Sequence, residues 1–153
     1  YQEEVEATVA EHAASTQTLH AVLADLGARG AELKVEMPDR ELVGRVVHLG
    51  VGLVVIENLG GERFDLGLDA VGLVRQTKGA ERPGPVSTGH PHTLQARLRE
   101  ALGGGERVSL SRRFGALVSG TIVGVSDSHV QGVDTHGLGF LIPLHMVTWI
   151  TTL

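Results

Sequence analysis

The chain contains an internal repeat that covers most of its length. Shifted by 76 positions, segment 42–56 falls on segment 118–132, and the match continues without a gap until Val74 falls on Ile150. A self-match at a fixed period is stronger evidence of architecture than any single motif. The sequence therefore predicts two copies of one structural unit within these 153 residues.

Each copy begins with a short amphipathic helix. Apolar residues recur at helical spacing over 2–26, where segment 15–18 weakens the middle and could start a second helix with Thr16 or Thr18 as its N-cap. They recur again over 93–102, where a run of three glycines follows. Shifted by 75 positions, the second helix overlays the end of the first. The change of shift from 75 to 76 places one extra residue in the turn around 112–115, where an insertion costs little.

Short stretches rich in Val, Ile and Leu follow the first helix, and turn residues separate them. These stretches are 33–37, 42–49, 53–56, 64–66 and 71–74. Short strands with glycine-rich turns and no helix between them predict an antiparallel meander. We expect it to form a small closed barrel rather than an open sheet, because closure removes exposed edges. Gly44 and Gly120 are expected at the strongest bend of a long second strand.

The repeat predicts a mainly β fold with helices, divided into four parts. These are an N-terminal helical extension over 1–17, a first unit over 18–75, a linker over 76–92 and a second unit over 93–153. The linker is rich in Gly, Pro and His and breaks the hydrophobic pattern. Units of roughly 60 residues are near the lower limit for an independent core, so packing against each other or oligomerisation is expected.

A short helix followed by five strongly bent strands resembles the Sm-like family of small SH3-like barrels. The resemblance is clearest over 123–130, which is similar to the family's second strand, acidic loop and third strand. It covers 18–75 and 93–153. It implies two tandem Sm-like units, each a short N-terminal helix plus a five-stranded, strongly bent antiparallel barrel. It also implies edge-to-edge or ring assembly and, in many members, binding of single-stranded RNA.

The residues with which this family binds RNA are mostly replaced in the chain. Asp127 is followed three positions later by Val130 rather than by Asn, and Pro143-Leu144 stands where the family has Arg-Gly. A formal net charge of −5 also disfavours a polyanionic ligand. The candidate surface for RNA or another ligand consists of Arg112, Arg113, Asp127 and His129.

Two predicted strands of the second unit, 138–142 and 146–153, carry none of the charged residues that commonly protect a sheet edge. Arg63 and Asp65 interrupt the fourth strand of the first unit, so its edge is expected to be better protected. The candidate interface residues are Phe140, Ile142, Val147, Trp149 and Ile150. We expect the units to pair through one edge within the chain and through the remaining edge between chains.

Other classes of protein find little support. Without cysteine there is no disulfide, thiol nucleophile or cysteine-based zinc site. Ser126, Asp127 and His129 are too close in sequence for a converging triad. His129 and His136 flank opposite ends of one strand, which separates them as metal ligands. No apolar run reaches the length of about 18 residues typical of a membrane span.

The sequence thus predicts a cytoplasmic protein that is not an enzyme and holds no metal or cofactor. Its predicted function is that of a small-barrel assembly or protein-interaction module that pairs through edge strands. The expected partners are further copies of the chain and, through the N-terminal helix, another protein. The alternative prediction is an RNA-associated regulator of Sm-like type.

Overall fold

The computed structural model describes residues 18–78 and 86–153, in which two α-helices accompany an eleven-stranded sheet. The predicted extension over 1–17 lies outside the described residues. In chain order the elements are α2 (Leu19–Ala28), β1 (Glu32–Glu36), β2 (Glu41–Leu49), β3 (Leu53–Asn58), β4 (Arg63–Gly67), the 3₁₀ turn η1 (Leu68–Ala70), β5 (Leu73–Lys78), β6 (Ser87–Thr88), α3 (Leu94–Gly104), β7 (Arg107–Arg112), β8 (Val118–Val125), β9 (His129–Asp134), β10 (Gly139–Pro143), the 3₁₀ turn η2 (Leu144–Met146) and β11 (Val147–Thr152).

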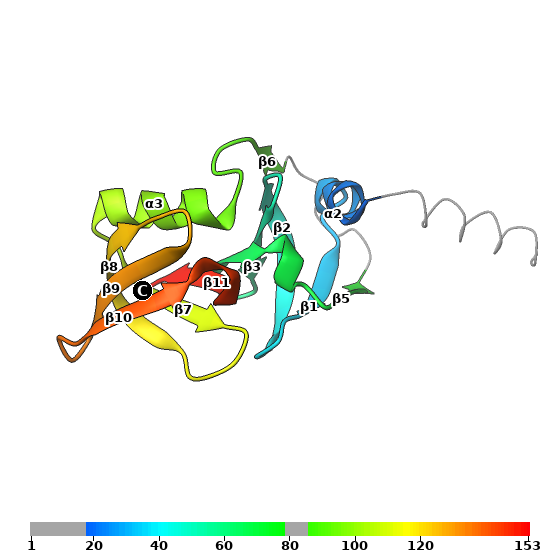
Figure 1. Ribbon diagram of the computed structural model, residues 1–153. Helices are drawn as coiled ribbons and strands as arrows, with labels where there is room; N and C mark the ends of the chain where they lie inside the picture. The colour runs from blue at the N-terminus through cyan, green and yellow to red at the C-terminus, as the bar shows by residue number, and fades with distance from the viewer. Residues whose placement is uncertain (1–17, 79–85) are drawn as a thin grey trace, which may run out of the picture.

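The sheet is open and runs across the whole described molecule. Its order is β10-β9-β8-β7-β11-β4-β3-β2-β1-β5, and the two-residue β6 pairs in parallel with β2. We call β1–β5 the first strand set and β7–β11 the second (Figure 1). The predicted mainly β fold with helices is confirmed. Hydrogen bonding does not close either set, because the fourth and fifth strands of a set do not pair with each other, and β11 pairs instead with β4 of the other set.

The hydrogen-bonding registers of the two sets agree. In each set the strand order is fifth, first, second, third, fourth. A bulge interrupts the pairing of β2 with β3 between Val46 and His48. The pairing of β8 with β9 is interrupted between Ile122 and Gly124, which are the same positions shifted by 76. The sequence repeat is therefore also a repeat of strand register.

The two helices occupy equivalent places and begin in the same way. Thr18 caps α2 and Thr93 caps α3, and each side-chain oxygen accepts a backbone N–H at 3.1 Å. The second helix extends to Gly104, slightly beyond the predicted end, because Gly105 is the glycine that adopts the left-handed conformation (φ 61°). Neither α2 nor α3 is long and apolar enough to cross a membrane.

Each strand set has its own hydrophobic core beneath its helix. Leu23 of α2 is buried in the core of the first set, and Leu98 of α3 is buried in the core of the second. Trp149 is the exception, because it lies on β11 of the second set but packs in the core of the first. A side chain from one set thus fills the core of the other.

The described end of the predicted linker, residues 86–92, is docked on the first strand set. The backbone N–H of Gly52 donates to the carbonyl of His92 at 2.9 Å, and β6 pairs with the end of β2. The first set also continues to Lys78, beyond the expected boundary at 75. Residues 86–92 therefore pack against the first set before α3 begins.

Substitution of Gly120 by alanine is expected to destabilise the fold by about 2–3 kcal/mol, since a Cβ has no room there. It would lie 2.1 Å from the carbonyl oxygen of Val133, and at the equivalent Gly44 it would lie 2.2 Å from that of Glu57. Gly103 in α3 has no atom within 4 Å of a new Cβ, so Gly103→Ala should be stabilising. Thermal unfolding of both variants checks this, and a Gly120→Ala protein that melts like the wild type would contradict the lack of room for a Cβ beside the carbonyl of Val133.

Candidate functional site

The strands β4 and β11 join the two sets into one sheet. They run antiparallel, with Trp149 opposite Leu66 and Ile150 opposite Asp65. β4 is the fourth strand of the first set, and β11 is the fifth strand of the second set. The pairing of the two units within one chain, predicted from their edges, is present. We call this contact the internal junction.

An ion-pair network lies at the internal junction. The Nε of Arg97 on α3 donates to Oδ2 of Asp65 on β4 at 2.6 Å, and its Nη2 donates to Oε1 of Glu106 at 2.9 Å. The side chains of Arg97 and Asp65 are only 12% and 10% exposed. Thr152 on β11 donates to the same Glu106 oxygen. The expectation that Asp65 protects the β4 edge is wrong, because Arg97 neutralises it and β11 covers that edge.

The protonation equilibria of this network reflect its burial. Burial raises the pKa of Asp65 and outweighs the opposing hydrogen bond from Arg97. The hydrogen bond from Arg97 holds the pKa of Glu106 below its usual value. Burial alone would lower the pKa of Arg97, but its hydrogen bonds to Glu106 and Asp65 together raise that pKa. The guanidinium thus stays charged, while Asp65 depends on it to remain ionised in a poorly solvated site.

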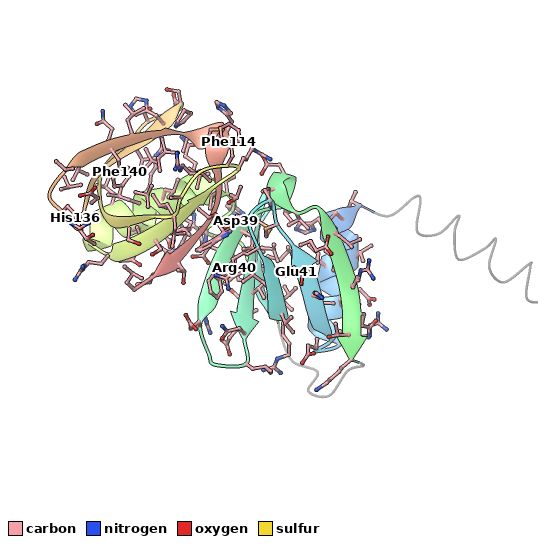
Figure 2. The ribbon with its side chains drawn as sticks, turned by 90° about the horizontal axis from the view of Figure 1, so that it is seen from below. Asp39, Arg40, Glu41, Phe114, His136 and Phe140 are labelled. Atoms are coloured by element: carbon pink, nitrogen blue, oxygen red, sulfur yellow. The ribbon has the colours of Figure 1, made fainter. Side chains whose placement is uncertain are left out.

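A second polar contact at the junction is centred on Asp39 in the turn between β1 and β2. Its carboxylate accepts the indole N–H of Trp149 at 3.2 Å and the hydroxyl of Ser111 at 2.5 Å. The guanidinium of Arg40 lies over the Trp149 ring at 5.5 Å from its centroid. Figure 2 places Asp39 at the boundary between the two strand sets. A turn of the first set therefore fixes the last strand of the second.

A third polar contact lies beside the 3₁₀ turn η1. Arg113, in the turn after β7, donates to Oδ2 of Asp69 at 3.2 Å and to the backbone carbonyl of His145 at 2.7 Å. Its guanidinium therefore links a turn of each set. Three polar contacts therefore connect the two sets at or beside the internal junction.

A polar cleft of about 570 Å³ opens above the ion-pair network, and both sets contribute to it. On its wall, His48 Nδ1 lies 3.0 Å from the hydroxyl of Ser87, and His48 Nε2 lies 2.9 Å from the carbonyl of Pro91. Because a carbonyl can only accept, Nε2 donates to Pro91, and in the neutral ring Nδ1 accepts from Ser87. Ser87, His48 and the carbonyl of Pro91 form a chain of hydrogen bonds, in which a carbonyl stands where a catalytic triad has a carboxylate. The group therefore fastens residues 86–92 to β2 and does not match a catalytic triad.

The predicted ligand surface is divided between two turns. Arg112 donates to the carbonyl of Ala116 in its own turn, and Arg113 belongs to the junction. Asp127 faces Arg99 at 3.5 Å, and His129 Nδ1 lies 2.9 Å from the hydroxyl of Ser126. Both turns reach η2, because Arg113 donates its backbone N–H to Met146 and Leu144 donates its own to Ser128. The four side chains share no hydrogen bond in the structure.

The predicted interface residues occupy three different places. Trp149 and Ile150 lie in the internal junction, and Val147 is buried in the core of the second set. Ile142 is buried on β10, while Phe140 on the same strand is half-buried against that core. The last strand is therefore an inner strand, and only the β10 members of the predicted interface lie on an outer one.

The outer strands of the sheet each border an apolar hollow. Within the described residues β5 pairs only with β1, and β10 pairs only with β9. Leu19 and Leu26 of α2 line a hollow of about 540 Å³ beside β5, together with Leu73. Phe114 and Leu141 line one of about 330 Å³ beside β10. The two outer strands lie at opposite ends of the molecule (Figure 1).

Other chemistry finds little support in the described parts of the chain. Residues 18–78 and 86–153 contain no group of three or more His, Asp or Glu side chains that could hold a metal ion. Sequence reasoning missed that Asp39 and Arg97 link the two sets, because each reads as an ordinary turn or surface charge, and it interpreted Asp65 only as a charge that protects an edge. Neither the comparison with protein-family models nor the comparison with characterised proteins finds a match for this chain.

Proposed function

We propose that the chain is a non-catalytic assembly module, formed by two tandem Sm-like small barrels, that associates with further copies through its outer strands. The observation that carries the proposal is the pairing of β4 with β11. In it, the fourth strand of one set meets the fifth strand of the other. The outer strands left over are β10, a fourth strand, and β5, a fifth strand. The same kind of contact is therefore available between one copy and the next.

The chemistry of the two ends supports this reading. Exposed apolar side chains gather at the β10 end, where Phe114 is 72% exposed, Leu138 66% and Leu141 57%. Leu19 and Leu73, at the β5 end, are 41% and 36% exposed. Unpaired strand edges combined with exposed apolar side chains are typical of association surfaces. A contact between different ends of identical chains either closes into a ring or continues as a filament.

The contacts of the basic side chains favour assembly over binding of RNA. A phosphate-binding surface requires arginines that are free to reach a backbone. Arg113 and Arg97 instead hold the internal junction together, and Arg112 is bonded to its own turn. The RNA-associated alternative therefore has fewer available cations than the sequence indicates.

Light scattering over a range of concentrations is expected to show a dimer or a larger closed ring. Leu73→Lys, which places a charge on the β5 edge, should shift the protein to monomer. Val123→Lys is a matched control, because Val123 is 57% exposed but lies on the inner strand β8. A wild-type protein that stays monomeric would contradict the proposal. A 260/280 nm absorbance ratio that shows tightly bound nucleic acid would favour the RNA alternative.

A further inference from the structure

The internal repeat allows each contact of the internal junction to be compared with its counterpart at the outer strands. The ion pair of the junction joins Arg97 on α3 to Asp65 on β4. By the shifts of the repeat, 75 for the helix and 76 for the strand, the counterparts are Val22 on α2 and Leu141 on β10. A buried charged pair is thus matched by two apolar side chains.

The residues of the second polar contact also correspond to apolar residues at the outer strands. Asp39 binds the indole of Trp149 at the internal junction. At the shift of 75, the counterpart of Asp39 is Phe114, in the turn between β7 and β8 that holds the extra residue, and the counterpart of Trp149 on β5 is Leu73. A carboxylate and its donor are replaced by an aromatic ring and an aliphatic side chain. The replacement again occurs on both partners of the contact.

These four counterparts lie where an edge-to-edge contact would need them. Val22 and Leu73 both line the hollow beside β5, and Phe114 and Leu141 both line the hollow beside β10. In each apolar pair, Val22 with Leu141 and Leu73 with Phe114, the first residue therefore lies at the β5 end of the molecule and the second at the β10 end. Each hollow is thus lined by apolar side chains that could pack against those of the other hollow.

Resting on the assembly proposed above, we infer that β10 of one copy pairs with β5 of a second copy through an apolar version of the internal junction. The register follows from the internal one, in which Trp149 faces Leu66 and Ile150 faces Asp65. It places Ile142 opposite Leu73 and Leu141 opposite Val74. The partner is a second copy of this chain, and Leu141 packs against Val22 of that copy.

The difference in polarity also gives each edge its own partner. A junction between Leu141 and Arg97 would deprive the guanidinium of Asp65 and leave it Glu106 alone, and one between Asp65 and Val22 would bury a carboxylate without a cation. Either mismatch is strongly unfavourable, and specificity between similar interfaces commonly relies on such mismatches. β4 therefore selects β11, and β10 selects β5.

The test transfers the ion pair of the internal junction to the outer one. Leu141→Asp and Val22→Arg should each weaken association by at least about 30-fold, because each places an unpaired charge in an apolar contact. The double variant should recover association, since it recreates the Asp–Arg pair. An equimolar mixture of the two single variants should also associate, because each variant supplies what the other lacks. Val123→Asp is the control for added charge, because Val123 is as exposed as Leu141 (57%) but lies on the inner strand β8.

Each outcome decides between the two proposals. A monomeric wild type removes the assembly and this inference with it. A wild type that associates, with single variants that associate equally well, would leave the assembly standing and overturn the inference. If the single variants dissociate and the double variant does not recover association, the pairing of Val22 with Leu141 is overturned.

A cysteine pair tests the register independently of charge, because the chain has no cysteine of its own. In a variant with Val74→Cys and Leu141→Cys, oxidation should produce covalent multimers, since Cα atoms of facing antiparallel residues lie at the separation that a disulfide needs. The pair Val74→Cys and Val123→Cys is the control. Covalent multimers from the control alone would overturn the inferred register.

Discussion

Replacing Arg97 by valine is expected to destabilise the fold by about 3–5 kcal/mol at neutral pH, because it leaves a buried carboxylate without its cation. The side chain of Asp65 is 10% exposed and lies 2.6 Å from the guanidinium. Glu106 would lose the same partner but is 28% exposed and can reach water. Most of the loss therefore originates at Asp65. The loss of stability can be measured by chemical denaturation. The fluorescence of Trp149, the only tryptophan of the chain, follows the unfolding.

The matched variant removes both charges. Arg97→Val combined with Asp65→Leu recreates at the internal junction the apolar pair found at Val22 and Leu141. A buried ion pair replaced by apolar residues commonly keeps most of the stability, so the double variant should be within about 1.5 kcal/mol of the wild type. A double variant that is less stable than Arg97→Val would contradict this account of the network.

The loss caused by Arg97→Val should also depend on pH. Burial already raises the pKa of Asp65, and the variant lacks the cation that opposes this effect. A carboxyl group with a raised pKa in the folded state holds its proton more tightly there than in the unfolded chain. Its contribution to stability is thus complete below the unfolded pKa of about 3.9 and is lost as the pH rises through the folded value. The difference between wild type and variant should grow from acid to neutral pH, and a constant difference would exclude Asp65 as its source.

The elements of the fold could be predicted from the sequence because their signals are local. Thr18 and Thr93 stand at the starts of two amphipathic helices, and the side-chain oxygen of each accepts a backbone N–H. Gly44 and Gly120 mark equivalent points of two long strands, where a side chain would meet a carbonyl. Such features depend on hydrophobic spacing and on turn residues a few positions apart.

The charges on single strands did not allow a prediction of which strand edges pair with each other. Asp65 was expected to protect β4, but the cation that neutralises it lies on α3, in the other half of the sequence. The pairing of β4 with β11 likewise depends on how two folded sets meet. For the same reason, the sequence suggested that each unit would close on itself. Long-range contacts of this kind leave no periodic signal within either strand.

A usable signal nevertheless exists in the differences between the two copies. Polarity differs at several equivalent positions of the two copies, among them Val22, which is equivalent to Arg97, and Leu141, which is equivalent to Asp65. A change of polarity at equivalent positions indicates that the two copies meet different surroundings there. These two changes belong together, because Arg97 and Asp65 touch at the internal junction. Paired differences between repeats at touching positions thus point to a contact surface that the similarities conceal.

Replacing Trp149 by alanine is expected to cost about 3–5 kcal/mol, because this side chain of the second set fills the core of the first. The ring is 2% exposed and meets Phe64 edge to face, with centroids 5.4 Å apart. Its indole N–H also donates to Asp39. Trp149→Phe keeps an aromatic ring and loses the hydrogen bond, so a smaller loss of about 1–2 kcal/mol is expected.

The position of Trp149 also determines where the fold should loosen. Val147 lies on the same strand and is equally buried, but it belongs to the core of the second set. Amide hydrogen exchange should therefore show lost protection in β3 and β4 for Trp149→Ala, and in β7 and β8 for Val147→Ala, since exchange reports local opening. Circular dichroism supplies the stabilities, because the first variant lacks the fluorescent probe. Loss of protection confined to β7–β11 in Trp149→Ala would show that the indole does not support the first core, and the two sets would then be joined by backbone pairing and the polar contacts alone.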